Sequence, residues 1–256
     1  MDENTKISCL IPPITSDRRW KIKVLTVETQ ETPMLHNWIN SLTRNGYDFE
    51  ILGYGEEWEG LSWKNKKFIE RLSEEKEEMI FVLSDSTNTI FIRSPLQLML
   101  AFKNYKTDLV ISANQHLDVS TKATDIAQKR NLKSRYCIPV DGFIIGFRSA
   151  ILDYLCSNFH VNENFFLINW LINSLDSKLD IYATLNLNFN ENDFELIEIV
   201  DKEKIRHVET KAYPCSITFQ QHNKHYDQLS KLILGEEAKK INRQFLSKFY
   251  EKKWLE

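Results

Sequence analysis

The hydrophobic positions change period several times near the beginning of the chain. Residues 21–27 form a short run rich in β-forming side chains, and Thr32-Pro33 is typical of the N-cap and first turn of a helix. That helix should end near Asn45-Gly46, and residues 49–52 form a second apolar run after the glycine. A strand, a helix and a strand in this order predict a parallel sheet.

The same plan repeats around the most apolar strand of the sequence. A charged helix is expected at about residues 65–78, and residues 79–83 are apolar on both faces, as in a central parallel strand. Ser94-Pro95 begins a further helix, and residues 108–113 form another buried strand. We therefore expect an α/β fold with a mostly parallel central sheet.

Beyond this strand the pattern is less regular. Residues 114–136 are polar, basic and poorly periodic, which is typical of a long surface loop or flap. We expect a strand at 142–147, helices at about 148–158 and 162–174, short strands and polar turns over 179–220, and amphipathic helices after about 226. The predicted division is a lead-in over residues 1–20, a single α/β domain over residues 21–225 and a C-terminal helical extension over residues 226–256.

Composition limits the classes of function. The 256 residues, 42% of them hydrophobic, are enough for one substantial core. With 33 basic and 36 acidic residues the formal net charge is −3, so no global positive field attracts nucleic acid, and the short basic cluster within residues 122–135 is weak support for that partner. The four cysteines lie far apart, and neither they nor the histidines have the spacing of a zinc site.

The sequence also bears on cellular location. The first 23 residues carry charges on both sides of one short apolar stretch, which is too short for a signal peptide. No stretch reaches the roughly 20 uncharged apolar residues of a membrane span. We therefore expect a cytoplasmic protein, or one of the secretory pathway if a signal has been removed.

An acidic turn, Ser84-Asp85-Ser86-Thr87-Asn88, follows the most apolar strand. In an open α/β sheet, ligands bind outside the carboxyl ends of the strands. Asp85 and Asn88 can direct two oxygen atoms to one point, where a divalent cation would bridge the pyrophosphate of a nucleotide. An ordinary turn has the same composition, so both interpretations stay open at this point.

Four separated segments carry distinctive motifs. They are residues 24–32 with a threonine-rich end, Leu-Gly-Tyr-Gly-Glu-Glu-Trp at 52–58, residues 80–95 with the acidic turn and the Ser-Pro helix start, and Gly-Phe-Ile-Ile-Gly-Phe at 142–147. Together they resemble the glycosyltransferase domain of the multifunctional procollagen lysyl hydroxylases, for which the second and third motifs are the specific ones. The resemblance spans about residues 20–225 and implies a metal-dependent domain of the GT-A type that uses UDP-sugars.

The resemblance implies roles for individual positions. Trp58 would form a stacking or apolar wall for the uracil or the sugar, or else is a half-buried aromatic residue. Lys66 would face phosphate, or else is a solvated helix lysine. A divalent cation, Mn²⁺ by resemblance, would be held by Asp85, Asn88 and His222. The positions implied for the UDP-sugar pocket as a whole are Thr26, Thr29, Trp58, Lys66, Asp85, Ser86 and Thr87.

The sequence departs from the family's pattern at positions that carry catalysis. Asn88 replaces the second carboxylate of the turn, which implies weaker metal binding, and Thr87 replaces a tyrosine that packs on the nucleotide. Residues 162–166 retain only Glu163 as an acidic group, where the family has a run of aspartates. The family's metal-binding histidine falls at Phe219 in direct register, and at His222 only if the loop shifts by three residues.

Two hypotheses about function follow. In the first, the protein transfers a hexose from a UDP-sugar to a protein or glycan acceptor, collagen-type by resemblance, with Asp141 and Glu163 as candidate catalytic carboxylates. Asp141 precedes the glycine of the strand expected at 142–147, where it either replaces a lost carboxylate or is a simple turn residue. In the second, the protein is a catalytically inactive relative that serves as a protein-interaction module through residues 114–136 and the C-terminal helix.

Overall fold

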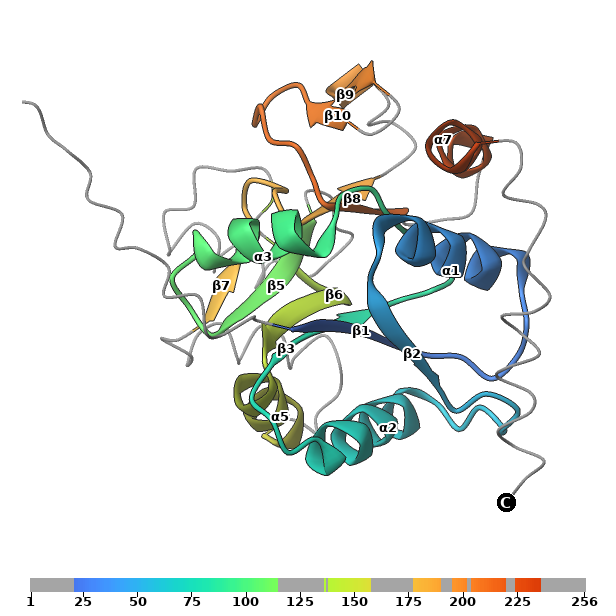
Figure 1. Cartoon of the computed structure of the whole chain (residues 1–256), viewed down its shortest axis with the longest axis vertical. Coiled ribbons are helices and arrows are strands. Elements are labelled where there is room, and N and C mark those ends of the chain that lie inside the picture. The colour runs from blue at the N-terminus through green and yellow to red at the C-terminus, as the bar shows by residue number, and fades with distance from the viewer. Residues whose placement is uncertain are drawn as a thin grey trace, which may run out of the picture.

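A six-stranded sheet forms the centre of the protein (Figure 1). The computed structural model describes residues 21–114, 136, 138–157, 177–189, 195–201, 204–219 and 224–235. The strand order in the sheet is β2-β1-β3-β6-β5-β7. In chain order these strands are β1 (Ile22–Val27), β2 (Asp48–Leu52), β3 (Ile80–Ser84), β5 (Leu109–Asn114), β6 (Ile138–Phe147) and β7 (Ser177–Leu179).

The strands of this sheet run in one direction with a single exception. β1 pairs in parallel with both β2 and β3, and β5 pairs in parallel with β7. β6 is antiparallel to its two neighbours, β3 and β5. The expected α/β fold with a mostly parallel central sheet is therefore confirmed, and the reversal of β6 is a feature that its apolar pattern did not reveal.

Helices cover both faces of the main sheet. Figure 1 shows α1 and α3 on one side and α2 and α5 on the other, and each pair packs on its own buried apolar cluster. None of the helices in the described part of the chain is long and apolar enough to cross a membrane. The described helices are α1 (Pro33–Asn45), α2 (Leu61–Glu74), α3 (Pro95–Lys103), α5 (Arg148–Cys156) and α7 (Lys224–Leu234).

Local capping explains where the first helices begin and end. The Thr32 hydroxyl accepts a hydrogen bond from the Leu35 amide at 3.1 Å, and Pro33 occupies the first turn of α1. Gly46 ends this helix in the left-handed conformation, with φ of 77°. Ser94 and Gln97 form a capping box at the start of α3. These helix limits agree with the sequence prediction.

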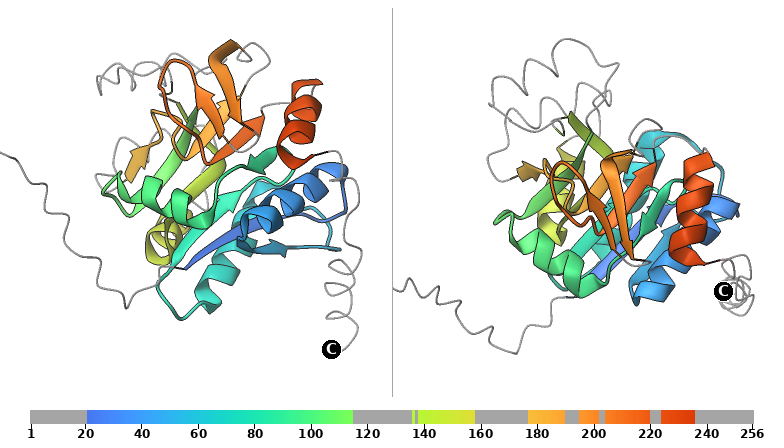
Figure 2. Two further views of the ribbon diagram at one scale, coloured as in Figure 1. Left: turned by 45° about the horizontal axis from the view of Figure 1, so that its top comes forward. Right: turned by 90° about the horizontal axis from the view of Figure 1, so that it is seen from above.

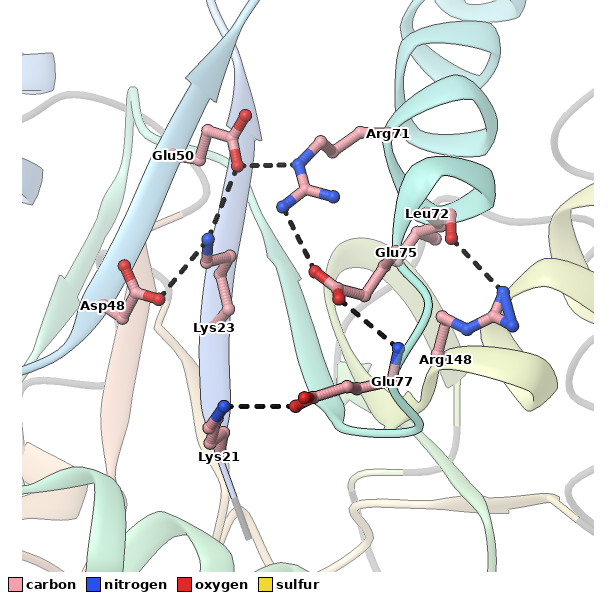
Figure 3. Close-up of polar contacts among 9 residues, drawn as sticks. All are labelled: Lys21, Lys23, Asp48, Glu50, Arg71, Leu72, Glu75, Glu77 and Arg148. Carbon is pink, nitrogen blue, oxygen red and sulfur yellow. Dashed lines mark hydrogen bonds and ion pairs between the residues drawn. The ribbon is translucent and has the colours of Figure 1, made fainter.

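Charged residues join α2 to the edge of the main sheet (Figure 3). Glu50 on β2 accepts a hydrogen bond of 2.8 Å from Arg71 Nε of α2. Lys23 on β1 lies 3.7 Å from Glu50 and 3.4 Å from Asp48. Single partly exposed ion pairs contribute only about 0.2–1 kcal/mol, but this network links two strands and a helix and so orients α2 on the sheet.

Two smaller sheets and α7 complete the described structure. β4 (Thr89–Phe91), β11 (Ser216–Phe219) and β8 (Asn186–Phe189) form a three-stranded sheet, and β9 (Ile197–Asp201) with β10 (Lys204–His207) forms a hairpin. Figure 2 shows these strands and α7 together on one side of the molecule. The short strands expected over 179–220 are thus present. The helix expected at 162–174 and residues 115–135 of the expected loop lie outside the described residues.

The start of the expected C-terminal extension packs on the rest of the protein. Tyr226, Leu229 and Ile233 of α7 are buried in the same apolar cluster as residues of the main sheet. The Tyr226 hydroxyl accepts a hydrogen bond from Asn37 of α1 at 3.1 Å. The helical spacing that predicted this segment therefore marks a face that belongs to the core.

A buried carboxylate holds the turn between β7 and β8. Asp180 is fully buried and accepts hydrogen bonds of 2.8 Å each from the amides of Thr184, Leu185 and Asn186, and another from the Tyr105 hydroxyl. Burial raises the pKa of Asp180, although these hydrogen bonds oppose the rise. Because four donors point at this side chain, both of its oxygen positions must be hydrogen-bond acceptors.

Replacing this acceptor should destabilise the protein. In Asp180→Asn the amide must turn its NH₂ group toward a backbone or hydroxyl donor, so at least one buried N–H loses its partner. We expect the free energy of unfolding to fall by about 1–3 kcal/mol in urea denaturation. Asp153→Asn, on the exposed surface of α5, is the matched control and should change it by less than about 0.5 kcal/mol. Equal stability of the two variants would contradict this role of Asp180.

Candidate functional site

Three loops meet at the carboxyl ends of β1, β2 and β3. The Gly55 amide, in the loop after β2, donates a hydrogen bond of 2.9 Å to the Thr29 carbonyl after β1. The Glu28 amide likewise donates to the Leu52 carbonyl at 3.0 Å. The turn that begins with Asp85 follows β3, which lies beside β1. The segments that carry the sequence motifs therefore lie together at the sheet edge where α/β proteins bind ligands.

The acidic turn is held from two sides. The Asp85 amide donates a hydrogen bond of 3.0 Å to the Gly142 carbonyl of β6. A Cβ atom at Gly142 would lie 3.3 Å from Asp85 Oδ2, so a glycine there lets the two backbones approach closely. On the other side, Lys64 Nζ of α2 lies 2.5 Å from Asp85 Oδ1. The Lys64 side chain is only 13% exposed, so this ion pair is largely removed from water.

Two further carboxyl groups surround this ion pair. Glu28 follows β1 directly and accepts a hydrogen bond of 2.6 Å from the hydroxyl of the buried Ser86. Asp141 on β6 keeps contact with solvent and interacts electrostatically with both Lys64 and Asp85. The described site thus contains three carboxyl groups and one ammonium group.

Burial and mutual charge shift the pKa values of this cluster. Burial raises the pKa of Glu28, and the charge of Asp85 adds to the rise, while the Ser86 hydrogen bond and Lys64 lower it. Surrounding protein atoms likewise raise the pKa of Asp141, although its surface is open to solvent. Burial lowers the pKa of Lys64, but Asp85, Asp141 and Glu28 outweigh that effect and raise it overall. Lys64 therefore stays an ammonium group at neutral pH.

An exposed indole borders the site. Trp58 lies in the loop after β2 with 48% of its surface exposed, and its ring meets Trp63 of α2 edge-on, with 5.5 Å between the ring centroids. Trp63 in turn packs on Gly53, where a Cβ atom would lie 2.5 Å from the indole. Gly53 has φ of 72°, a conformation that other residues seldom adopt. Trp58 is thus packed against a residue that is itself held in place, and part of its surface is open to a ligand.

The structure separates the two lysines near the start of α2. Lys66, the lysine expected to face phosphate, has a side chain that is 62% exposed, and its Nζ lies 3.8 Å from Glu70 of the same helix. Lys64 reaches the acidic turn instead. The expected helix began at about residue 65, whereas α2 begins at Leu61 and includes Lys64 in its first turn. Lys66 thus matches the second interpretation, a solvated helix lysine, and a role toward phosphate stays a prediction.

The other expected pocket residues differ in what they offer. Thr26 is buried within β1, and Thr29 contributes its carbonyl to the contact between the loops. Ser86 is buried and holds Glu28, so it acts on the site through that residue. Thr87 is exposed at the tip of the turn. Glu163 lies outside the described residues.

The expected metal ligands are incompletely assembled in the described part of the chain. Asn88 Oδ1 is buried and has no hydrogen-bond partner among the described residues, and the Asn88 carbonyl accepts from the Phe219 amide at 2.9 Å. Phe219, the direct-register position of the family's histidine, is fully buried, and its ring contacts Phe189 and Tyr226. His222 lies outside the described residues, within which no group of three or more acidic, histidine or cysteine residues is placed to hold a metal.

Glu28 and Lys64 are the site residues that sequence reasoning missed. Glu28 had a usable signal, because it is the first residue after a strand whose carboxyl end was expected to face the ligand. Lys64 had one as well, because it precedes Phe68 by four residues and Leu72 by eight and so shares the helix face that these two bury.

A charged cluster at the carboxyl edge of a mostly parallel sheet is the arrangement of ligand-binding α/β domains. A family model described as the PLOD GT domain, where GT denotes glycosyltransferase, matches residues 18–256. The chain therefore belongs to this family of glycosyltransferase domains. This confirms the resemblance to the procollagen lysyl hydroxylases that the four sequence motifs indicated.

Curated relatives are similar over most of the chain. Procollagen-lysine,2-oxoglutarate 5-dioxygenase 1 of Homo sapiens is 24% identical over 258 residues, which cover 90% of this chain and 32% of the relative. The protein of the same name from Bos taurus is 27% identical over 128 residues, or 46% of this chain and 16% of the relative. The chain spans about a third of the length of the human relative.

Solved structures are similar at a lower level. A glycosyltransferase involved in the glycosylation of the major capsid of PBCV-1 has a TM-score of 0.49 and 13% identity, covering 82% of this chain and 99% of that one. The glycosyltransferase GlyE of Streptococcus pneumoniae TIGR4 has a TM-score of 0.45 and 11% identity, covering 91% of this chain and 64% of that one.

The raised pKa of Glu28 predicts a pH-dependent stability effect. Its carboxyl has a pKa above 4.5 in the folded protein, so ionisation of Glu28 opposes folding above that folded pKa and has no such effect below about pH 4.5. Glu28→Gln keeps an oxygen that accepts from Ser86 and removes the charge. We expect the variant to melt about 1–3 °C higher than the parent at pH 7.5, and the difference to disappear toward pH 4.5.

A matched control separates this effect from a general change in net charge. Glu57→Gln removes one charge from the exposed loop after β2 and should leave the melting temperature within about 1 °C at every pH. Scanning fluorimetry across the pH range measures both variants. A lower melting temperature for Glu28→Gln at pH 7.5 would contradict the proposed desolvation of Glu28.

Proposed function

We propose that the protein transfers a hexose from a UDP-sugar to a hydroxyl group of a protein or glycan acceptor. The observation that carries the proposal is the Lys64–Asp85 ion pair at the carboxyl end of β3, in a chain that belongs to a family of glycosyltransferase domains. The loops after β1 and β2, hydrogen-bonded to each other through Thr29 and Gly55, border the same place. The loops that would bind the nucleotide therefore lie next to the charged residues that would bind its diphosphate.

Each part of the donor has a chemically suitable partner. Trp58 offers an exposed aromatic surface to the uracil or the sugar. The ammonium of Lys64 offers positive charge to the diphosphate. When the bond between the sugar and the diphosphate breaks, negative charge accumulates on the leaving UDP, and a cation fixed beside it lowers the barrier. Catalysis in this proposal is mainly electrostatic positioning.

Asp141 is the described carboxyl group best suited to the acceptor. It is open to solvent, and surrounding protein atoms raise its pKa. A carboxylate with a raised pKa is a stronger base, and can accept the proton of the acceptor hydroxyl as that oxygen attacks the sugar. The electrostatic interaction of Asp141 with Lys64 and Asp85 supports this role, because both belong to the proposed donor centre.

The positions that the family resemblance implied for a divalent cation supply few charged ligands in the described part of the chain. Asp85 Oδ1 already binds the ammonium of Lys64, and Asn88 offers one neutral oxygen where the family has a carboxylate. The direct-register position of the family's histidine is Phe219, whose ring is part of the apolar core. Hard divalent cations prefer several oxygen ligands, most of them charged. Glu28 and Asp141 are the other carboxyl groups near Asp85, and the ammonium of Lys64 lies among all three.

Binding of UDP tests the proposal, and Trp58 offers a specific variant. UDP at millimolar concentration should raise the melting temperature of the protein, because a ligand that binds the native state stabilises it. Trp58→Ala should weaken UDP binding about tenfold, a loss of about 1.4 kcal/mol, as expected for an aromatic stacking partner. Leu100→Ala removes an equally exposed apolar side chain from α3 and should leave UDP affinity unchanged.

The thermal shift with UDP also defines the result that contradicts the proposal. If UDP at millimolar concentration produces no thermal shift, whether Mn²⁺ or a chelator is present, the chain does not bind this donor. Calorimetry of UDP with the same three proteins provides an independent measurement of affinity.

The departures from the family pattern favour one alternative function. Asn88 in place of a carboxylate and the buried ring of Phe219 are the changes expected of a relative that has lost catalysis and serves as a protein-interaction module. Release of UDP from UDP-hexoses, followed with and without added acceptor hydroxyl compounds, separates the two. Binding of UDP without any turnover would support the inactive alternative.

A further inference from the structure

We propose that the ammonium group of Lys64 takes the place of a divalent cation at Asp85, so that the donor diphosphate binds this site without a metal. This inference rests on the proposed function, since it concerns how the same site binds a UDP-sugar. The observation that carries it is the contact itself: Lys64 Nζ lies 2.5 Å from Asp85 Oδ1, with the two side chains 13% and 31% exposed.

The polypeptide holds Lys64 at this position. Lys64 lies in the first turn of α2, where its amide donates to the Gly60 carbonyl at 3.1 Å. Its neighbour Trp63 packs on Gly53, and further along the helix Phe68 and Leu72 are buried in the core. The ammonium is therefore presented by an element that is anchored on both sides of it.

The other lysines of α2 have different partners. Lys66 lies 3.8 Å from Glu70 and is largely exposed, while Lys67 lies 2.5 Å from Glu56 in the loop after β2. Among the lysines at the start of this helix, Lys64 is thus the one that contacts the acidic turn. The arrangement selects one cation for this turn rather than presenting a general basic surface.

Three carboxyl groups surround a position suited to a cation, and the ammonium of Lys64 occupies it. Glu28, Asp85 and Asp141 all act on Lys64 from neighbouring strands. A divalent ion bound by Asp85 would lie next to the ammonium, and repulsion between them is strong where protein atoms replace water. The remaining oxygen donor of the turn, Asn88, is neutral and does little to offset that repulsion.

The ammonium can still bind a diphosphate while it holds Asp85. A lysine ammonium has three N–H donors, and the contact with Asp85 uses one of them. The other two are available to phosphoryl oxygens of the donor. Asp85 then acts as a positioning residue, because its carboxylate fixes the ammonium at the end of β3.

Titration of UDP in the presence and absence of metal tests this inference. Isothermal titration calorimetry should give the protein the same affinity for UDP, within about twofold, in EDTA and in Mn²⁺. Lys64→Gln should bind UDP at least tenfold more weakly in EDTA, while Lys64→Arg, which keeps the charge, should retain most of the affinity. Lys66→Gln, changed on the exposed side of the same helix, should stay within about twofold of the parent.

The possible results distinguish failure of the metal-free role of Lys64 from failure of the proposed function. If the parent protein binds UDP only with Mn²⁺, or if Lys64→Gln binds UDP in EDTA as tightly as the parent, the metal-free role of Lys64 is wrong and the proposed function stands. If the parent binds no UDP in either buffer, the proposed function fails. The comparison of EDTA with Mn²⁺ in the parent needs no variant, so it decides the question even if Lys64→Gln does not fold.

Discussion

The ion pair between Lys64 and Asp85 joins the first turn of α2 to the turn after β3, and the geometry of the site depends on it. Without a partner, the Asp85 carboxylate would face Glu28 and Asp141 as a third negative group in a partly buried place. Like charges in such surroundings repel strongly, because little water screens them. The ammonium relieves this repulsion and at the same time fixes the helix against the strand edge, so electrostatics and packing impose the same arrangement.

The other side of the acidic turn is fixed by the small sheet. Directly after the turn, Thr89 of β4 hydrogen-bonds through its hydroxyl to Thr218 of β11 at 2.9 Å. The Phe219 amide donates to the Asn88 carbonyl at 2.9 Å. These contacts come from a segment about 130 residues away in sequence, and they hold the turn between α2 and β11. The turn is thus held by α2 on one side and by β11 on the other. These contacts give a short polar turn a defined geometry.

Membership in the glycosyltransferase family and the departures from its pattern have a common physical interpretation. The sheet edge, the loop contacts and the exposed Trp58 lie where the proposed nucleotide donor would bind. The changes at Asn88 and Phe219 affect groups that would bind a cation. In the proposed function, Lys64 next to Asp85 supplies positive charge that a metal would otherwise bring, so fewer metal ligands would be compatible with binding of the donor.

The sequence was sufficient to predict the α/β class from its apolar runs and the limits of α1 from its capping residues. The position of Asp85 after the most apolar strand predicted the edge of the sheet that carries the candidate site. These features depend on residues close together in sequence, so local patterns report them. The antiparallel direction of β6, the small sheet and the contact of Lys64 with Asp85 needed the tertiary structure. Each of them depends on contacts between distant segments: Lys64 shares the helix face of Phe68 and Leu72, and the packing of that face beside the turn after β3 brings its ammonium to Asp85.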